Sequence, residues 1–396
     1  MDLTRTARYV ALAVVAVLVA TMGINGGVSE TWTTPRARGQ SNDTRLRLAF
    51  YYPWFLYHWQ ENGIYPLTHY HPALGYYDSS DAIVIRKHID AMQYARIDAA
   101  IASWWGRDNR YGTDVALRRI LKESRDSGFR WAVYYEWEGP VDNIPRDPSR
   151  SEIVSDLDYL YANFANDPSY LHIDGRWVLF VYSDDTDGCG MVSRWTEAMA
   201  SHPEAYVVLR VFHGYTSCAA QPDGWHQYSV NAYGFDSQQD YSYYSYTIQP
   251  GFWSAVKDCP RLERDLARWK ENIRNMISSG ATFQLVSTFN EWGEGTPVES
   301  ATEWATPSGY GAYLDALHSS GDINVSESTN QGTGGGFAPV AVELGVGVAI
   351  ALAAIAITVK MSKPKREASS HCRYCGKRIS SNSRFCQFCG GPLPNV

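Results

Sequence analysis

The chain has 396 residues, of which 45% are hydrophobic and 19% charged, a composition that excludes a wholly disordered chain. Aromatic residues reach 14%, and so many Tyr and Trp indicate surfaces that stack on flat apolar ligand faces. The net charge is −7, and because the C-terminal tail is basic, the main body is strongly acidic. Nucleic acid is therefore not an expected partner of this body, since phosphate binding requires clustered Lys and Arg.

The first 27 residues predict a signal peptide or an N-terminal membrane anchor. Arg5 and Arg8 precede an apolar run over residues 9–24. That run suits the core of a signal peptide better than a full bilayer span. Small residues follow it, but no A-x-A cleavage site is present, so both alternatives stay open.

Residues 40–319 predict the main domain, a (β/α)8 TIM barrel of the α/β class. Eight apolar, strand-like runs are separated by helical patterns, which matches the number of strands and the size of such a barrel. The strands are predicted at 45–54, 97–105, 130–138, 176–183, 205–212, 225–234, 246–253 and 282–292. The helices are predicted at 81–96, 114–127, 151–165, 190–201, 260–279 and 309–319.

The carboxyl ends of the predicted strands indicate where the site lies, because in a barrel these ends hold the functional residues. Nearly every one ends in Tyr or Trp, and several add a carboxylate. Aromatic rings that stack on the C–H faces of sugars, beside acids that bind hydroxyls, indicate a carbohydrate site. About half of these rings are expected to belong to the core, since aromatic side chains are mostly buried.

Glu291 and Glu294 are the candidate catalytic pair. They lie three residues apart at the end of the last predicted strand, where Gly293 and Gly295 permit a turn that lets both carboxylates converge. Two carboxylates at one glycosidic bond are the usual arrangement in glycosidases, and their repulsion yields an acid beside a base. The alternative is a capping Glu and a solvated loop Glu.

On these motifs the main body resembles glycoside hydrolase family 99, whose members are retaining endo-α-mannosidases on a (β/α)8 barrel. The resemblance rests on AFYYPW at 49–54, HPALGYYDSSD at 71–81, SWWG at 103–106, YYE at 134–136 and STFNEWGEGTPVES at 287–300. Members of the family often have His where this chain has Gly293. The body also resembles a neighbouring group linked to polysaccharide biosynthesis.

The resemblance implies roles for the matching residues. Glu294 would be the general acid/base, and Glu291 would deprotonate the 2-hydroxyl of the sugar, which then attacks the anomeric carbon to give a 1,2-anhydro sugar. The substrate-binding residues would be Tyr52 or Tyr51, Trp104 or Trp105, Trp54, Tyr233, Asn290, Trp292 and Glu136. Glu136 and Glu138 share one face of the third strand, so one of them would bind a hydroxyl unless it forms a buried ion pair.

The C-terminal part begins with a linker at 320–336, rich in Gly, Ser, Thr and Asn. Residues 337–359 then predict a transmembrane helix, since this run is apolar except for Glu343 and basic residues follow it. The positive-inside rule places the basic flank in the cytoplasm and the barrel outside the cell. A buried core helix is the alternative.

Four cysteines near the C-terminus predict a zinc ribbon at 371–393. Cys372, Cys375, Cys386 and Cys389 form two C-x2-C pairs, the spacing with which four thiolates hold one tetrahedral structural Zn²⁺. Two disulfides are the alternative, which is disfavoured because thiols stay reduced in the cytoplasm.

Three further cysteines, Cys189, Cys218 and Cys259, lie in the barrel, and any single disulfide among them leaves one over. The sequence alone does not decide whether Cys189 pairs with Cys218 or with Cys259.

These segments together predict a glycoside hydrolase tethered to the cell membrane by one or two helices, with the barrel outside and the zinc ribbon in the cytoplasm. Its substrate would be a glycan or polysaccharide with α-mannosidic or related α-glycosidic linkages, its catalysis would need no cofactor, and its ribbon would be available to a cytoplasmic protein partner. A non-catalytic glycan receptor stays open, although a pure binder needs no acid/base pair. A polysaccharide-biosynthesis enzyme also stays open, although no Gly-rich phosphate-binding loop is present.

Overall fold

The computed structural model describes residues 45–321, except for 56–58, 61–62, 108, 110, 139–146, 184–187, 213 and 229–244. The segments predicted at 1–27, 337–359 and 371–393, and the linker after Gly321, lie outside the described residues. Within the described part of the chain, no helix has both the length and the apolar character that a membrane span requires.

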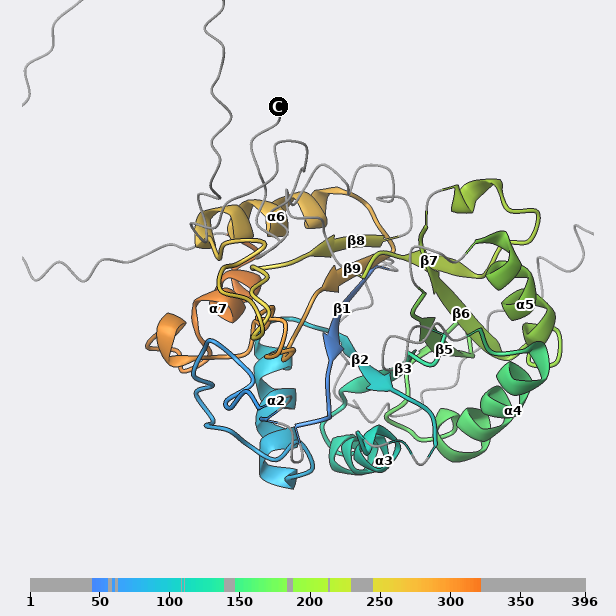
Figure 1. Ribbon diagram of the computed structural model, residues 1–396, viewed down its shortest axis with the longest axis horizontal. Helices are drawn as coiled ribbons and strands as arrows, with labels where there is room; N and C mark the ends of the chain where they lie inside the picture. The colour runs from blue at the N-terminus through green and yellow to red at the C-terminus, as the bar shows by residue number, and fades with distance from the viewer. Residues whose placement is uncertain are drawn as a thin grey trace, which may run out of the picture. The chain divides into compact units, whose positions relative to one another are not determined.

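Eight parallel strands form a nearly closed barrel, as the sequence predicts (Figure 1). They are β1 (Leu46–Tyr51), β2 (Ala99–Trp104), β3 (Arg130–Tyr135), β5 (Arg176–Val181), β6 (Ala205–Arg210), β7 (Gly224–His226), β8 (Ser245–Ile248) and β9 (Phe283–Val286). Their order around the sheet is β7-β6-β5-β3-β2-β1-β9-β8, so the first strand pairs with the last. The short β4 (His172–Ile173), which the sequence does not predict, pairs antiparallel with β5.

The seam of the barrel lies between β7 and β8, which no backbone ladder joins in the described residues. Side chains bridge this seam instead. The backbone N–H of Gln227 donates to the hydroxyl of Ser245 at 3.0 Å, and the hydroxyl of Thr247 donates to the carbonyl oxygen of Gln227. Hydroxyl groups therefore supply the contacts that a strand ladder supplies elsewhere in the barrel.

Helices lie outside the ring of strands (Figure 1). The α-helices of the described residues are α2 (Ala82–Tyr94), α3 (Thr113–Ser124), α4 (Arg150–Leu160), α5 (Cys189–Met199), α6 (Leu266–Ser278) and α7 (Ala312–His318). Each overlaps a predicted range. Capping groups set where some of them begin. Ser149 and Glu152 form a capping box at α4, and Asp265 caps α6, which begins six residues later than predicted.

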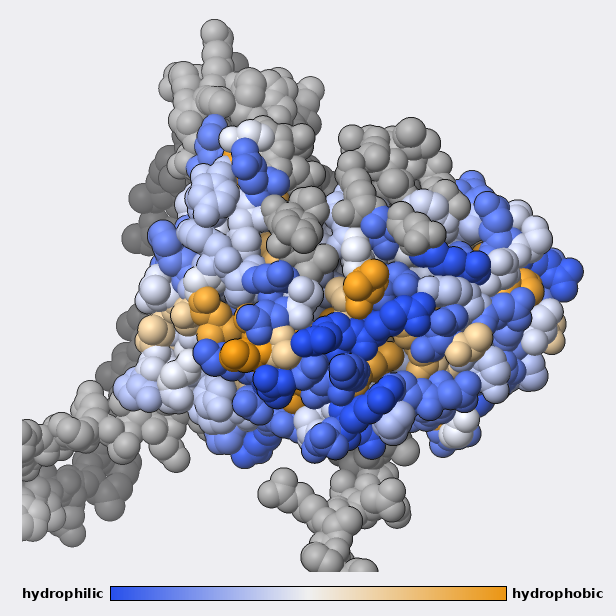
Figure 2. All heavy atoms as spheres, turned by 90° about the horizontal axis from the view of Figure 1, so that it is seen from below, coloured by the Kyte–Doolittle hydropathy of each residue, from blue (hydrophilic) through white to orange (hydrophobic). Residues whose placement is uncertain are grey.

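The core is built from strands that are buried on both faces, as parallel strands covered by helices require. Large rings fill the space between sheet and helices, and the polar tips of several are bonded. Trp131 donates to the hydroxyl of Ser124 at 2.7 Å, and Trp269 donates to the carbonyl oxygen of Tyr313 at 3.0 Å. Figure 2 shows one face of the molecule, which is mostly hydrophilic with only separate hydrophobic spots.

Cys189 and Cys218 form a disulfide that joins the start of α5 to the segment after β6. The Cα atoms of the two residues are 5.2 Å apart. The structure thereby decides the pairing that the sequence leaves open, and Cys259 is buried elsewhere in the domain.

Candidate active site

The segment after β9 brings both candidate glutamates to the carboxyl end of the barrel. Gly295 has φ +65°, and a Cβ there would lie 2.4 Å from the carbonyl oxygen of Trp253, so the turn requires glycine. Backbone N–H groups of Trp253 and Ala255, after β8, donate to the carbonyl oxygens of Glu294 at 2.9 Å and Gly293 at 2.8 Å. The segment that follows β8 therefore holds this turn in place.

Glu291 and Glu294 line a single pocket of about 210 Å³. The other residues that line it are Tyr52 and Trp54 after β1, Trp105 after β2, Glu136 after β3, Tyr182 after β5 and Tyr228 after β7. Segments from six strand ends thus place three carboxyl groups and five aromatic rings around one cavity. This is the composition that the sequence predicts for a carbohydrate site.

Glu291 is almost fully buried, with an exposed fraction of 4%. Its Oε1 accepts the N–H of Gly293 at 3.0 Å, while its Oε2 has no hydrogen-bond partner among the described residues. Burial, followed by the charges of Glu294 and Glu136, raises the pKa of Glu291 well above its usual value. Oε2 is therefore an acceptor that a ligand hydroxyl would satisfy.

Glu294 is half-buried, and burial raises its pKa to about 7. The hydroxyl of Tyr228, 3.5 Å from Oε2, and the charges of Arg261 and Arg210 act in the opposite direction. Tyr228 in turn accepts a hydrogen bond from the hydroxyl of Tyr52 at 2.6 Å. A carboxyl with a pKa near neutrality is suited to giving and taking a proton.

Glu136 is the third acid of the pocket. Burial, with a further contribution from the charge of Glu294, raises its pKa to about 8, and a hydrogen bond with Ser103 acts the other way. Ser103 also accepts the ring N–H of Trp105 at 3.0 Å, which joins the acid to the pocket wall. Oε1 of Glu136 is buried and has no hydrogen-bond partner among the described residues.

The structure separates neighbours that the sequence treats as alternatives. Tyr52 and Trp105 line the pocket, and Tyr51 and Trp104 do not. The hydroxyl of Tyr51 bonds to Nδ1 of His88 at 3.0 Å, and the ring N–H of Trp104 donates to Asp114 at 3.0 Å. Adjacent residues differ in this way because side chains alternate between the two faces of a strand.

Glu138 is also separated from Glu136. It forms an ion pair with Arg194 and accepts the ring N–H of Trp195 at 2.8 Å, both from α5. Glu138 therefore forms the buried structural ion pair that the sequence left as one alternative. Glu136 lines the pocket, as the hydroxyl-binding alternative requires.

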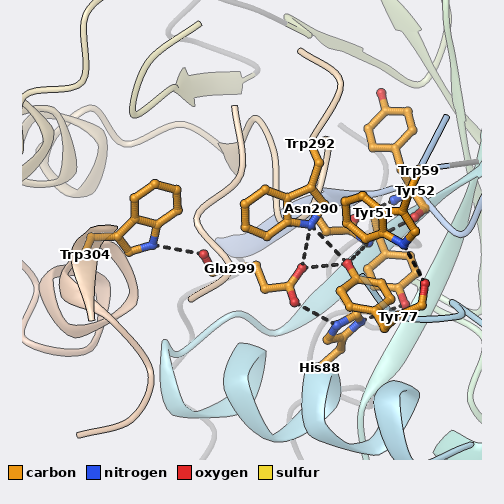
Figure 3. A network of polar contacts seen from close by, with 9 residues as sticks. All are labelled: Tyr51, Tyr52, Trp59, Tyr77, His88, Asn290, Trp292, Glu299 and Trp304. Atoms are coloured by element: carbon orange, nitrogen blue, oxygen red, sulfur yellow. Dashed lines mark hydrogen bonds and ion pairs between the residues drawn. The ribbon is translucent and has the colours of Figure 1, made fainter. Parts of the chain in front are cut away.

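Asn290 and Trp292, predicted to bind substrate, are not part of the pocket lining. Figure 3 shows them in a network of polar contacts with Tyr52, Tyr77 and Glu299. The amide of Asn290 pairs with the backbone of Tyr52, accepting its N–H at 2.7 Å and donating to its carbonyl oxygen at 2.9 Å. The ring N–H of Trp292 donates to Tyr77 at 3.2 Å and to Glu299 at 3.1 Å. Both residues thus hold the segment on which Glu291 stands.

Tyr182 and Tyr228 line the pocket but were not singled out from the sequence. Tyr182 lies at the carboxyl end of the strand predicted at 176–183, so the rule that identified the other strand ends applies to it. Tyr228 lies inside the strand predicted at 225–234, but β7 ends earlier, at His226, and this places Tyr228 just beyond the strand end. Tyr233, the remaining predicted substrate-binding residue, lies outside the described residues.

In the part of the chain that the structure describes, no group of three or more potential ligands is placed to hold a metal ion.

Residues 65–259 match the family model described as glycosyl hydrolase family 99. The chain is thus similar to glycoside hydrolase family 99 over about half of its length. It is 24% identical over 299 residues to the glycoprotein endo-alpha-1,2-mannosidase-like protein of Mus musculus, covering 63% of this chain and 61% of that protein. It is 23% identical over 301 residues to the glycoprotein endo-alpha-1,2-mannosidase of Rattus norvegicus, covering 62% and 59%. The chain thus spans about three fifths of the length of these curated relatives.

Among solved structures, the chain is similar to the GH99 endo-alpha-mannosidase from Bacteroides thetaiotaomicron. The match covers 69% of this chain and 95% of that chain, with a TM-score of 0.53 and 19% identity. At this identity the likeness establishes the fold, which agrees with the barrel described above.

We predict that the free energy of unfolding falls less with rising pH in the Glu136→Gln variant than in the wild type. A buried carboxyl whose pKa is raised to about 8 stays protonated in the folded state while the unfolded chain ionises. Wild-type stability is therefore lost as the pH rises from the usual pKa of a Glu to the folded pKa, by up to about 5 kcal/mol, of which about 4 kcal/mol falls between pH 5 and pH 9. Urea unfolding of both proteins at pH 5 and pH 9 measures this. An equal pH dependence in the two proteins would contradict it.

Proposed function

We propose that this chain is a glycoside hydrolase that cleaves α-mannosidic or related α-glycosidic linkages within a glycan, with retention of configuration. The observation that supports it best is the convergence of Glu291 and Glu294, both with raised pKa, in one aromatic pocket of a family 99 domain. Relatives of the domain named endo-alpha-mannosidases support the substrate class.

In the first step of the proposed reaction, the sugar acts as its own nucleophile. Glu291 takes the proton of the 2-hydroxyl, and O2 forms a bond to the anomeric carbon. The bond from that carbon to the leaving oxygen breaks, and Glu294 gives that oxygen its proton. The products are a 1,2-anhydro sugar, the released part of the glycan, a protonated Glu291 and an ionised Glu294. Glu294, with a pKa of about 7, is largely protonated below neutrality as this step requires.

In the second step the roles reverse. Glu294 takes a proton from water, the water oxygen bonds to the anomeric carbon, and the bond from that carbon to O2 breaks. Glu291 returns its proton to O2, so both acids regain their starting states. Two displacements at the same carbon give overall retention.

The unpartnered Oε2 of Glu291 supports its role as the base. With only protein around it, this buried carboxyl favours the protonated form. A sugar hydroxyl that donates to Oε2 supplies the hydrogen bond that favours the ionised form. Substrate binding thereby shifts Glu291 toward the state in which it accepts a proton.

The other lining residues fit a sugar. Trp54 and Trp105, with ring centroids 6.2 Å apart, and Tyr182 offer apolar faces for pyranose rings. Glu136 has a free buried oxygen that would bind a hydroxyl. Asn290 and Trp292 act in this proposal through the residues they hold, not through the sugar.

We predict that Glu291→Gln and Glu294→Gln both lose activity but differ in their dependence on the leaving group. Each should lose about 10² to 10⁴-fold on the natural glycan, the range for a positioned acid or base. An aryl leaving group needs little protonation, so Glu294→Gln should keep part of that rate, whereas Glu291→Gln should not. The measurement compares aryl and natural glycosides, with Glu197→Gln, exposed on α5, as the control.

Three results would count against this mechanism. Near wild-type rates in both variants would exclude the pair. Efficient cleavage of substrates that lack the 2-hydroxyl would exclude the anhydro-sugar route. Glycan binding without any turnover in the wild type would instead favour a non-catalytic glycan receptor.

We further propose that the barrel is held outside the cell by the apolar run at 337–359, with the basic tail in the cytoplasm. The basic residues that follow this run support that orientation. Protease added to intact cells should remove the barrel and leave an epitope at the C-terminus protected, because the membrane separates the two. Digestion of the tail together with the barrel would contradict the proposed topology.

The same proposal gives the tail a structural Zn²⁺, held by Cys372, Cys375, Cys386 and Cys389. A tail of this size has no core of its own, so metal binding and folding should be coupled. Full-length protein expressed with zinc should contain about one Zn²⁺ per chain, and a Cys372→Ser Cys375→Ser variant should contain none. Equal zinc content in both proteins would contradict the site. The folded ribbon is then the surface for a cytoplasmic protein partner.

A further inference from the structure

Two tyrosines are exposed beside the active site, in the segment between β1 and α2. Tyr65 is 63% exposed and Tyr76 is 38% exposed, and their ring centroids are 6.0 Å apart. Neither lines the pocket that holds Glu291 and Glu294. Two neighbouring exposed rings are unusual, since apolar residues on a monomer surface are normally scattered singly.

This aromatic pair is continuous with the catalytic segment. Tyr76 lies 5.0 Å from the ring of Trp59, which lies 6.3 Å from the ring of Trp292. Leu67, two residues after Tyr65, borders Gly293. A Cβ added at Gly293 would lie 3.5 Å from the Leu67 side chain and 3.0 Å from Oε1 of Glu291. The segment that bears the two tyrosines therefore borders the segment that bears the catalytic pair.

Hydrogen bonds fix this segment against the residues that follow the catalytic turn. The N–H of Ala73 donates to the carbonyl oxygen of Ser300 at 2.8 Å, and the N–H of Thr302 donates to that of His71 at 2.9 Å. Within the segment, the ring N–H of Trp59 donates to the carbonyl oxygen of Tyr77 at 2.8 Å. The tyrosines are thus presented on a preorganised support, which lowers the entropic cost of binding.

Polar groups lie beside the rings. Nδ1 of His71 contacts Oε1 of Glu303 at 2.7 Å, and both side chains are accessible to solvent. Backbone contacts bring this pair to the segment of the tyrosines, since His71 lies five residues before Tyr76 and accepts the N–H of Thr302, the residue next to Glu303. Burial, followed by the charge of Tyr65 and then that of Glu303, raises the pKa of Tyr76. Rings flanked by hydrogen-bonding groups suit a ligand with both apolar faces and hydroxyls, which is the chemistry of a pyranose.

We propose that Tyr65 and Tyr76, flanked by the His71–Glu303 pair, form an accessory subsite for a pyranose unit of a glycan chain. The proposal rests on the proposed function in that the same chain would enter the catalytic pocket. Two rings offer too little area for a stable protein interface but enough for one or two sugar units. An occupied subsite anchors a long chain outside the pocket, which favours cleavage within the chain over removal of an end unit.

The test measures glycan binding in a catalytically impaired background. Glu294→Gln protein with and without Tyr65→Ala Tyr76→Ala is run on native gels containing an α-mannan or an α-glucan. Loss of both rings should weaken retardation about 10-fold or more, since one aromatic contact contributes about 2- to 10-fold. The Tyr65→Phe Tyr76→Phe pair keeps the rings and should stay within about 3-fold. Tyr161→Ala, which removes a tyrosine 39% exposed after α4, is the control and should change nothing.

Kinetics in the active background give a second readout. Tyr65→Ala Tyr76→Ala should raise KM on the polysaccharide about 10-fold with kcat nearly unchanged, and should leave the rate on a short aryl glycoside as in the wild type. Thermal unfolding verifies that the variants are folded.

The outcomes separate the two proposals. Loss of binding in the Ala pair without any hydrolysis by the wild type would support the subsite and reject the hydrolase function. Hydrolysis with unchanged binding and KM in the Ala pair would reject the subsite alone. The subsite would also be overturned if neither polysaccharide retards the Glu294→Gln protein. The same holds if Tyr161→Ala weakens the retardation as much as the Ala pair does.

Discussion

The site depends on the side chain of Asn290, which makes the backbone hydrogen bonds that a neighbouring strand would otherwise make. β1 and β9 pair until β9 ends at Val286, and the chain then turns. The N–H of Phe289 still reaches the carbonyl oxygen of Phe50 at 2.7 Å, and the amide of Asn290 meets both backbone groups of Tyr52. Buried backbone groups must be paired, so without Asn290 both of these would be left unsatisfied. One residue thus keeps two strand ends together past the point where the sheet stops, and both Glu291 and the Tyr52 hydroxyl take their positions from it.

Buried acids in this barrel fall into two kinds, and hydrogen bonding distinguishes them. Glu299 accepts from Tyr77 at 2.7 Å, from Trp292 at 3.1 Å and from His88 at 3.1 Å, so both of its oxygens are bonded (Figure 3). Glu291 and Glu136 are as deeply buried, yet each has an oxygen without a partner. A satisfied acid stabilises the fold around it, whereas an unsatisfied one costs stability that a bound ligand offsets. Hydrogen bonding thus distinguishes Glu299, which supports the site, from Glu291 and Glu136, which belong to it.

The sequence predicted the elements and the convergence of Glu291 and Glu294 better than it predicted the residues around them. Every strand of the barrel overlaps a predicted range, and several coincide with a near-continuous apolar run, because burial on both faces leaves a strong local signal. Glu291 and Glu294 were identifiable because the glycines around them permit the turn. Whether Trp104 or Trp105 enters the pocket depends on one residue of register, which the apolar run leaves undetermined.

Contacts distant in sequence explain the other differences. Glu136 and Glu138 have the same alternation, but β3 ends at Tyr135, and α5 then supplies Arg194 and Trp195 to Glu138. Asn290 was assigned to the substrate because it belongs to the motif that holds Glu291 and Glu294. In the structure its amide pairs with the backbone of Tyr52, which is 238 residues away in the sequence. Such pairings leave no trace in composition or periodicity, so only the folded chain shows them.

The seam between β7 and β8 has a topological consequence. Taken circularly from β8, the strands follow one another along the chain as β8, β9, β1, β2, β3, β5, β6 and β7, which is also their order across the sheet. Arg47 on β1 donates to the carbonyl oxygen of Leu317 in α7 at 3.3 Å, so the first strand and the last helix are already adjacent. A circular permutant cut between β7 and β8, with α7 joined to β1, would therefore cross the whole sheet from one edge to the other without a long return connection. The permutant would keep every strand ladder of the barrel, and the turn that bears Glu291 and Glu294 would move from the end of the domain to the neighbourhood of its start.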